Sequence, residues 1–278
     1  MDIMTLTNDC WKPISGKIAV FIMTFAGDEK YLNECLRYLE IQKDRYNFEI
    51  FIIDDGKNPL ENPPKNCHYW KTFFERQGNL NGQECAHGML IEMLKIARMS
   101  KAEFILKIDC DQCVRTFENF LSPLKDNPKQ VIGFKLNPRM CYCSGVTYIL
   151  PTEGLYKAVK DFRKWYKEQR DLDALGEFAP HCPEDWAISR CVADVNDYQM
   201  TRWDNSKEVG AEHWLMSPFN FEEVKADGTI SPLSFSRFQI YDFVNFGNRY
   251  TILNNENPRE FAAECMKRFA DFDLNNQQ

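Results

Sequence analysis

The chain has 278 residues, 44% hydrophobic and 27% charged, the balance of an ordinary globular protein. Its 34 basic and 41 acidic residues give a net charge of −7, which argues against a protein that binds nucleic-acid phosphates over its whole surface. No segment reaches the roughly 18 consecutive apolar residues of a membrane-spanning helix, and the N-terminus lacks the apolar core of a signal peptide. With eleven scattered cysteines and no Asn-x-Ser/Thr sequon, these features predict a cytoplasmic protein without a transmembrane segment.

The N-terminal residues predict a β-α-β unit. Residues 17–25 form a near-continuous apolar run, typical of a strand buried on both faces of a parallel sheet. After Gly27 and Asp28 a helix is expected, because apolar residues recur every three or four positions: Tyr31, Leu32, Cys35, Leu36 and Leu39. A second buried strand, residues 48–53, follows. The crossover between the two strands is expected to be right-handed.

The next segments continue this alternation. Residues 57–66 carry three prolines and predict a loop, and a weaker strand is expected within residues 67–74. A helix over residues 83–99 precedes another buried strand, residues 104–108. The strands thus end in two acidic clusters, Asp54-Asp55-Gly56 and Asp109-Cys110-Asp111. Open α/β sheets bind ligands at the carboxyl ends of their strands, so both clusters mark a candidate site.

The second half predicts fewer regular elements. Strands are expected at 131–136 and 145–150, and helices at 152–170 and from Pro183 to 195. After Asp197 no clean periodicity appears until a helix at 258–272. We therefore expect one α/β domain with an irregular C-terminal portion.

Asp109 and Asp111 are candidate metal ligands. On an extended chain, side chains two residues apart point to the same side, so both carboxylates would reach one divalent cation such as Mg²⁺ or Mn²⁺. Their position directly after a buried strand favours this interpretation over a solvated acidic turn. A zinc site formed by Cys110, Cys113, Cys141 and Cys143 is a weaker alternative, because the last pair has a one-residue gap.

Two further pairs of acidic residues can each be interpreted in two ways. Glu184 and Asp185 open a helix, where they would cap it or where one would act as a general base, with Trp186 as a stacking surface for a sugar. Asp54 and Asp55 suit hydrogen bonds to a base or ribose, and turn chemistry explains them equally well.

The expected helix at 152–170 carries a basic face over an aromatic stripe. That face is either simply solvated or docks an anionic acceptor.

In this order, the pieces resemble the nucleotide-sugar-dependent glycosyltransferases of the GT-A fold. The strand ending in Thr24-Phe25, the Asp54-Asp55-Gly56 strand end and residues 78–82 look like that fold's nucleotide-binding half, and Asp109-Cys110-Asp111 looks like its DXD motif. More narrowly, Leu-Lys-x-Asp-x-Asp, Cys-Ser-Gly-x-x-Tyr-Ile-Leu and Glu-Asp-Trp are similar to motifs of the β-1,3-galactosyl- and N-acetylglucosaminyltransferases. The resemblance covers residues 17–215.

The resemblance implies a role for each matching position. Asp111 would ligate Mn²⁺, with Asp109 on the metal or the ribose and His213 as a further ligand. Asp185 would deprotonate the acceptor hydroxyl, and Glu184 would orient the acceptor. The acceptor side would also include Ser144, Gly145 and Trp186. The nucleotide-sugar would contact Thr24, Phe25, Asp54, Asp55, Asn81, Gly82, His87, Lys107 and Asp109.

The resemblance therefore implies a GT-A-like domain in which residues 17–135 bind the donor and residues 136–278 bind the acceptor. The implied reaction is metal-dependent transfer of a hexose or N-acetylhexosamine from a UDP-sugar to a hydroxyl. A single base without a nucleophile predicts inversion of the anomeric centre. The acceptor would be a glycan, a lipid-linked glycan or a modified nucleic acid base. A domain that binds a nucleotide or glycan without turnover is the non-enzymatic alternative.

Overall fold

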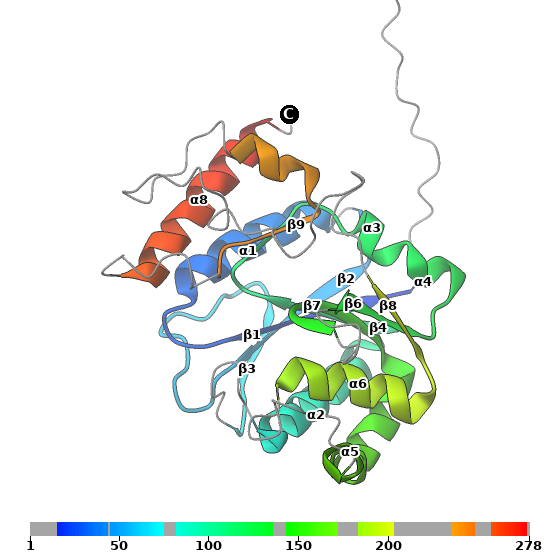
Figure 1. The fold of residues 1–278 in the computed structure, drawn as a ribbon. Helices are drawn as coiled ribbons and strands as arrows, with labels where there is room; N and C mark the ends of the chain where they lie inside the picture. The colour runs from blue at the N-terminus through cyan, green and yellow to red at the C-terminus, as the bar shows by residue number, and fades with distance from the viewer. Residues whose placement is uncertain are drawn as a thin grey trace, which may run out of the picture.

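A seven-stranded sheet forms the centre of the computed structural model (Figure 1). The structure describes residues 16–43, 45–74, 82–135, 143–171, 183–202, 235–247 and 257–276. The strand order is β3-β2-β1-β4-β7-β6-β8. Neighbours from β3 to β4 are parallel, and β7 runs antiparallel to both β4 and β6. The strands are β1 (Ile18–Thr24), β2 (Phe48–Asp54), β3 (His68–Lys71), β4 (Phe104–Asp109), β6 (Gln130–Lys135), β7 (Cys143–Pro151) and β8 (Gln199–Arg202).

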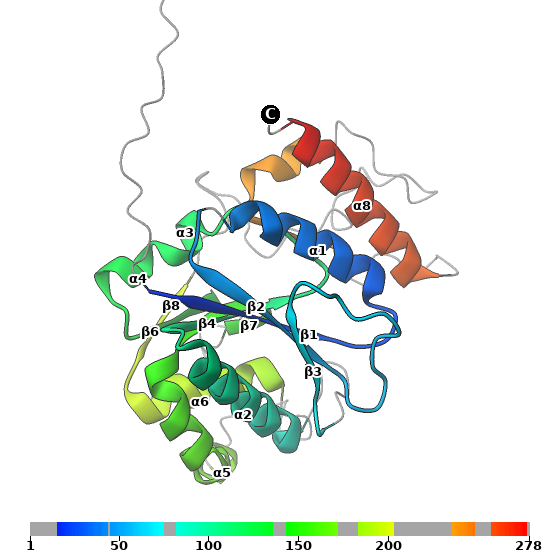
Figure 2. The ribbon, with the colours of Figure 1, turned by 180° about the vertical axis from the view of Figure 1, so that it is seen from behind.

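Helices cover both faces of this sheet. Two long helices, α1 (Glu29–Gln42) and α8 (Pro258–Asn276), lie on one face, as both views show (Figures 1 and 2). The other face carries α2 (Gln83–Ser100), α5 (Leu155–Asp171) and α6 (Glu184–Asn196). The predicted α/β class, with a mostly parallel sheet between helices, is confirmed. Among the described helices, none is long and apolar enough to cross a membrane.

The strand β1 shows why its sequence is apolar throughout. All seven of its residues are buried. Ile18, Val20 and Ile22 pack into the core beneath α1 and α8, whereas Ala19, Phe21 and Met23 pack into the core beneath α2, α5 and α6. Because side chains alternate along a strand, a strand between two helical layers must be apolar at every position.

Most predicted elements are present, with small shifts at their ends, and several short ones were missed. A separate two-stranded sheet pairs β5 (Gln112–Val114) with β9 (Phe243–Asn245). The strand β8 was also missed, as were the short helices α3 (Glu118–Leu121) and α4 (Pro123–Asp126) and the 3₁₀ turn η4 (Ser236–Ile240). The helix expected at 152–170 begins as a 3₁₀ turn, η1 (Thr152–Gly154), and continues as α5. Elements of three to five residues are too short to show a hydrophobic period.

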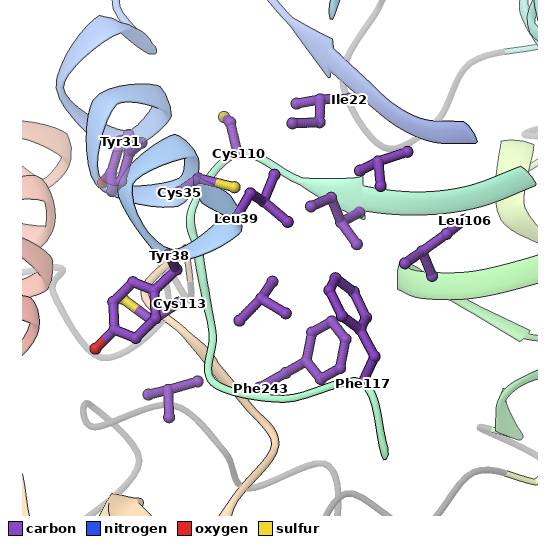
Figure 3. Close-up of a cluster of buried hydrophobic side chains, with 14 of the residues drawn as sticks. Ile22, Tyr31, Cys35, Tyr38, Leu39, Leu106, Cys110, Cys113, Phe117 and Phe243 are labelled. Carbon is purple, nitrogen blue, oxygen red and sulfur yellow. The ribbon is translucent and has the colours of Figure 1, made fainter. Parts of the chain in front are cut away.

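The cysteines after β4 belong to the core beneath α1. Figure 3 shows Cys110 and Cys113 among apolar side chains that include Cys35, Leu39 and Phe243. Burial raises the pKa of both Cys110 and Cys113, which disfavours the thiolate that zinc requires. No group of three or more His, Cys, Asp or Glu side chains able to hold a metal occurs in the described part of the chain, and Cys141 lies outside it. The zinc alternative therefore finds no support.

Candidate functional site

Parallel pairing brings both acidic clusters to one edge of the sheet. Thr24, the last residue of β1, is in register with Asp54 of β2, and the preceding Met23 is in register with Asp109 of β4. The carboxyl ends of three adjacent strands therefore meet there, in the place where open α/β sheets bind ligands.

Asp54 organises the loop that follows β2. Its Oδ1 accepts the N–H of Asp55 at 2.9 Å, and its Oδ2 accepts the N–H of Leu60 at 2.8 Å and the hydroxyl of Tyr69 at 2.5 Å. Burial raises the pKa of Asp54, while these hydrogen bonds oppose the shift. Both oxygens of Asp54 are therefore engaged within the protein, in keeping with the turn interpretation.

Asp55 and Gly56 complete the same loop. The Oδ1 atom of Asp55 accepts the N–H groups of Lys57 at 2.8 Å and Asn58 at 3.0 Å, an Asx-type turn. A Cβ atom at Gly56 would lie 2.4 Å from the carbonyl oxygen of Thr72, so only glycine permits this close approach.

A cation from the C-terminal helix reaches the end of β1. Arg259, in the first turn of α8, forms an ion pair with Asp28, and its guanidinium lies 4.5 Å from the ring centroid of Phe25. The Oδ2 atom of Asp28 accepts the N–H of Phe25 at 3.2 Å and the hydroxyl of Thr24 at 3.4 Å. Thr24 itself is fully buried, so Phe25 is the partly exposed residue of the two.

Asp109 is held by a buried lysine. The ammonium of Lys107 forms an ion pair with Asp109 Oδ1, and Lys107 is only 1% exposed, whereas the Asp109 side chain is 24% exposed. Lys107 lies in register with Tyr148 of β7, with its Nζ atom 5.9 Å from the centroid of that ring. The alternation of β4 directs Lys107 and Asp109 toward the face covered by α6.

Tyr148 connects this strand end to α6. Its hydroxyl is buried and has no hydrogen-bond partner among the residues that the structure describes. Burial raises the pKa of Tyr148, and the nearby charges of Glu184, Asp185 and Asp109 raise it further. Two of these carboxylates open α6, where the helix dipole favours negative charge. The Asp109 strand end and the N-terminus of α6 therefore face one another around a hydroxyl that remains protonated at neutral pH.

Glu184 and Asp185 differ in exposure. Glu184 is 6% exposed, and its Oε2 atom lies 4.0 Å from the sulfur of Cys85 in α2. Asp185 is partly exposed, and its Oδ1 atom accepts the N–H of Trp186 at 2.9 Å. No side chain caps α6 at its N-cap residue, Pro183, but Asp185 lies in the first helical turn, where the helix dipole favours its charge.

Asp111 lies against the small β5–β9 sheet. Its Oδ1 atom accepts the side-chain amide of Asn245 at 3.1 Å, and its carbonyl oxygen accepts the N–H of Phe246 at 2.8 Å. A Cβ atom at Gly247 would lie 1.7 Å from Asp111 Oδ2, so this glycine allows the chain to pass beside the carboxylate.

The expected common direction of Asp109 and Asp111 requires correction. The strand β4 ends at Asp109, and residues 110 and 111 form a turn, so strand alternation does not extend to Asp111. Asp109 contacts Lys107, whereas Asp111 contacts Asn245. Both still supply carboxylate oxygens at the same sheet edge, and Mg²⁺ or Mn²⁺ is commonly held by one or two carboxylates together with substrate phosphates. The donor chemistry therefore fits such an ion.

Two expected site residues lie within the helical layer. Trp186 is 2% exposed and packs against Trp165, with 5.2 Å between the ring centroids, so it has no free face for a sugar and its expected stacking role was wrong. His87 stacks on Phe162 at 5.1 Å, and its Nε2 atom lies 3.0 Å from the carbonyl oxygen of Val159. His87 therefore joins α2 to α5.

The other expected site residues are placed in part. Gly82 is exposed directly before α2, and Ser144 and Gly145 lie in β7. The neighbouring Cys143 donates its N–H to the hydroxyl of Ser189 in α6 at 3.1 Å, which places the start of β7 beside that helix. Asn81 and His213 lie outside the described residues.

Four residues at this edge were not predicted from the sequence: Arg259, Tyr148, Asn245 and Gly247. Tyr148 stood within a recognised motif, but its side chain carried no predicted role. Asn245 and Gly247 come from the segment after Asp197, where no period predicted an element. Arg259 lies within the expected helix at 258–272, whose period does not show what its first turn contacts.

No protein-family model matches the chain, and no curated protein matches it. Among solved structures it is similar to a glycosyltransferase involved in glycosylation of the major capsid of PBCV-1, with 13% identity, coverage of 90% of this chain and 98% of that chain, and a TM-score of 0.49. It is also similar to an active-site mutant of LgtC, with 12% identity, coverage of 91% of this chain and 95% of that chain, and a TM-score of 0.48. The galactosyltransferase LgtC in complex with donor and acceptor sugar analogs is 11% identical, with coverage of 91% of this chain and 95% of that chain, and a TM-score of 0.43. Likenesses at this level do not assign the chain to a family.

Proposed function

We propose that this chain is a glycosyltransferase that moves a hexose or N-acetylhexosamine from a UDP-sugar to a hydroxyl acceptor. The observation that carries the proposal is the arrangement at one edge of the sheet: Asp109 ends β4, and Glu184 and Asp185 open α6, the helix beside the strand β7 that pairs with β4. Glycosyl transfer needs a group that stabilises the leaving diphosphate and a base for the incoming hydroxyl. Two facing carboxylate groups suit these two tasks.

The donor side of the proposed site centres on Asp111 and Asp109. A divalent metal bound there would neutralise charge on the leaving diphosphate. Lys107 fixes the Asp109 carboxylate, and Asn245 fixes that of Asp111. Phe25 and Asp55 lie at the ends of the adjacent strands, where the nucleoside would bind. The motif resemblance alone supports three further roles: contacts with the donor for Asn81 and Gly82, and a bond to the metal for His213.

The acceptor side centres on Asp185. This carboxylate is partly exposed, as a base that meets an incoming hydroxyl must be. Glu184 is more deeply buried and would orient the acceptor. Ser144 and Gly145, in the strand beside α6, would line the same pocket. With one base and no nucleophile, we propose that the reaction inverts the anomeric centre.

The first experiment measures thermal unfolding with a panel of nucleotides and UDP-sugars, each with and without Mn²⁺. A ligand at a hundred times its dissociation constant raises the free energy of unfolding by about 2.7 kcal/mol. We expect stabilisation by UDP or one UDP-sugar that depends on the metal and is lost in Asp111→Asn. Asp126→Asn, an exposed carboxylate on α4, is the matched control. If no nucleotide stabilises the wild-type protein, the donor-site proposal is wrong.

The second experiment separates donor binding from transfer. Asp185→Asn keeps the shape of the side chain but removes the base, so donor affinity should stay within about twofold while the transfer rate falls by roughly 10²-fold or more. Substantial transfer by this variant would count against the assignment of the base. The anomeric proton in the product NMR spectrum reports stereochemistry, and a retained configuration would exclude the inverting mechanism.

A further inference from the structure

Large apolar side chains are strongly exposed at four described positions, and three of these gather on one side of the molecule. Phe73, Met99 and Tyr156 are 69%, 63% and 61% exposed. Phe73 lies beside Lys95 of α2, whose Nζ atom is 5.3 Å from its ring centroid. Tyr156, at the start of α5, lies beside Arg98, whose guanidinium is 5.9 Å from its ring centroid. Met99 comes four residues after Lys95 in α2, so the two side chains lie on the same face of that helix.

The outward face of α5 extends this group of cations. Tyr156, Lys160, Arg163 and Lys167 recur at spacings of four, three and four residues, which places them on one face of the helix. Residues 155–170 contain six basic residues and two acidic ones. The aromatic stripe on the opposite side is packed against the protein, since Phe162 is fully buried and Trp165 is 5% exposed.

Several of these cations are not neutralised. Arg163 pairs with Glu84 at 3.1 Å, and Lys164 lies 3.9 Å from Glu168. By contrast, four cations have no carboxylate partner in the part of the chain that the structure describes: Arg98, Lys101, Lys160 and Lys167. The protein as a whole carries a charge of −7, so this positive face is a local segregation of charge.

The positive face runs toward the edge that carries the proposed site. Arg98 near the end of α2 contacts Tyr156 at the start of α5, whereas Arg163 contacts Glu84 in the first turn of α2. The two helices are therefore antiparallel neighbours (Figure 2). The α2 N-terminus lies at the site edge, since Cys85 contacts Glu184, and α5 extends from the far edge toward it.

We propose that this surface docks the protein on an anionic lipid membrane. We call it the α2–α5 surface and define it by Phe73, Arg98, Met99, Tyr156, Lys160 and Lys167. Its cations match anionic headgroups in charge, and its apolar tips can enter the boundary between headgroups and acyl chains. A purely polyanionic partner such as RNA would use the cations but would leave the Met99 side chain without an apolar partner. The proposal goes beyond the glycosyltransferase function and does not depend on it.

The test measures sedimentation of the full chain with phosphatidylcholine vesicles that contain or lack phosphatidylglycerol. We expect binding only to the anionic vesicles, and weaker binding as NaCl is raised. The double variant K160E/K167E should bind roughly thirtyfold more weakly or worse, because each cation near such a surface strengthens binding about fivefold. M99S/Y156S should also weaken binding, but with an unchanged dependence on salt.

Matched controls come from the opposite face of the sheet. Ile41 on α1 is the fourth of these apolar residues and is 43% exposed. Arg45, which is also exposed, lies just after the end of the same helix. Ile41→Ser and Arg45→Glu should bind anionic vesicles like the wild-type protein, and melting curves check that every variant folds. Equal binding to both kinds of vesicle, or equal loss in the control variants, would overturn the proposal. Tight binding to RNA without binding to vesicles would also overturn it, because the partner would belong to another class.

Discussion

Two buried tyrosines on opposite faces of the sheet differ in one hydrogen bond. The hydroxyl of Tyr38 in α1 donates to Asp273 Oδ2 at 3.0 Å, and Asp273 is fully buried. The hydroxyl of Tyr148 in β7 is equally buried but finds no hydrogen-bond partner in the described part of the chain. A buried polar group without a hydrogen bond costs free energy, whereas a satisfied one is costly to remove. The unfavourable position of Tyr148 lies beside the three carboxylates of the proposed site, where function can offset such a cost.

We therefore predict opposite effects of one substitution at these two positions. Tyr38→Phe should lower the free energy of unfolding by about 1–3 kcal/mol, because a buried carboxylate loses a donor. Tyr148→Phe should leave the free energy of unfolding unchanged or raise it, while the rate of glycosyl transfer falls. Urea unfolding and a transfer assay measure both quantities. Clear destabilisation by Tyr148→Phe would mean that its hydroxyl is satisfied in solution and is no mark of the site.

At the scale of whole elements, α8 holds the loop that contacts Asp111. Phe269 of α8 is fully buried, with its ring centroid 5.6 Å from that of Phe246. Phe246 follows β9 and donates its N–H to the carbonyl oxygen of Asp111 at 2.8 Å. An element near the end of the chain thus supports the end of β4 through two contacts.

This chain of contacts predicts a difference between two core substitutions. Phe269→Leu and Phe162→Leu each remove part of a fully buried ring, and each should lower the free energy of unfolding by about 1–2 kcal/mol. Only Phe269→Leu should also weaken metal-dependent UDP binding, because Phe162 packs on the opposite face against His87 and Tyr166. Calorimetric titration with UDP and Mn²⁺ compares them. Equal affinities in the two variants would show that α8 does not position Asp111.

Some of the helices and strands could be predicted from the sequence, and others could not. The apolar runs of β1, β2 and β4 and the periodic helices α1 and α2 were predictable, because a strand or helix between two layers must carry that pattern. The pairing of β5 with β9 was not, because strands of three residues gain their stability from each other rather than from a pattern of their own. The contact between Asp111 and Asn245 depends on that pairing and was missed for the same reason.

Individual side chains limited the predictions in another way. The positions of Trp186 at a helix start and of Asp54 at a strand end indicated that they suit ligand contacts, but position and spacing do not show which way a side chain will point. The Trp186 ring packs against the Trp165 ring, and the Asp54 carboxylate accepts a hydrogen bond from the loop that follows it. Both choices are made by packing and hydrogen bonding with residues distant in the sequence.

Over the whole molecule, the expected donor and acceptor halves are joined by strand pairing and by side-chain contacts. The strand β4 of residues 17–135 pairs with β7 of residues 136–278, β5 pairs with β9, and Tyr31 of α1 donates to the carbonyl oxygen of Arg259 in α8 at 2.8 Å. The central sheet therefore crosses the boundary between the halves, and neither half contains all of its own strand partners.

From this interleaving we predict a single cooperative unfolding transition. The three tryptophans among the described residues, Trp70, Trp165 and Trp186, all pack in or against the core beneath α2, α5 and α6. Their contribution to the fluorescence of the six tryptophans reports that face, whereas far-UV circular dichroism reports all helices and strands. The two signals should give the same midpoint in urea, and UDP with Mn²⁺ should shift both by the same amount. Two separate midpoints, with only one moved by the ligand, would mean that donor and acceptor halves fold as separate units. Coincident midpoints would instead support one folding unit in which ligand bound at the strand ends of β1 and β4 stabilises the distant α5–α6 layer through the shared sheet.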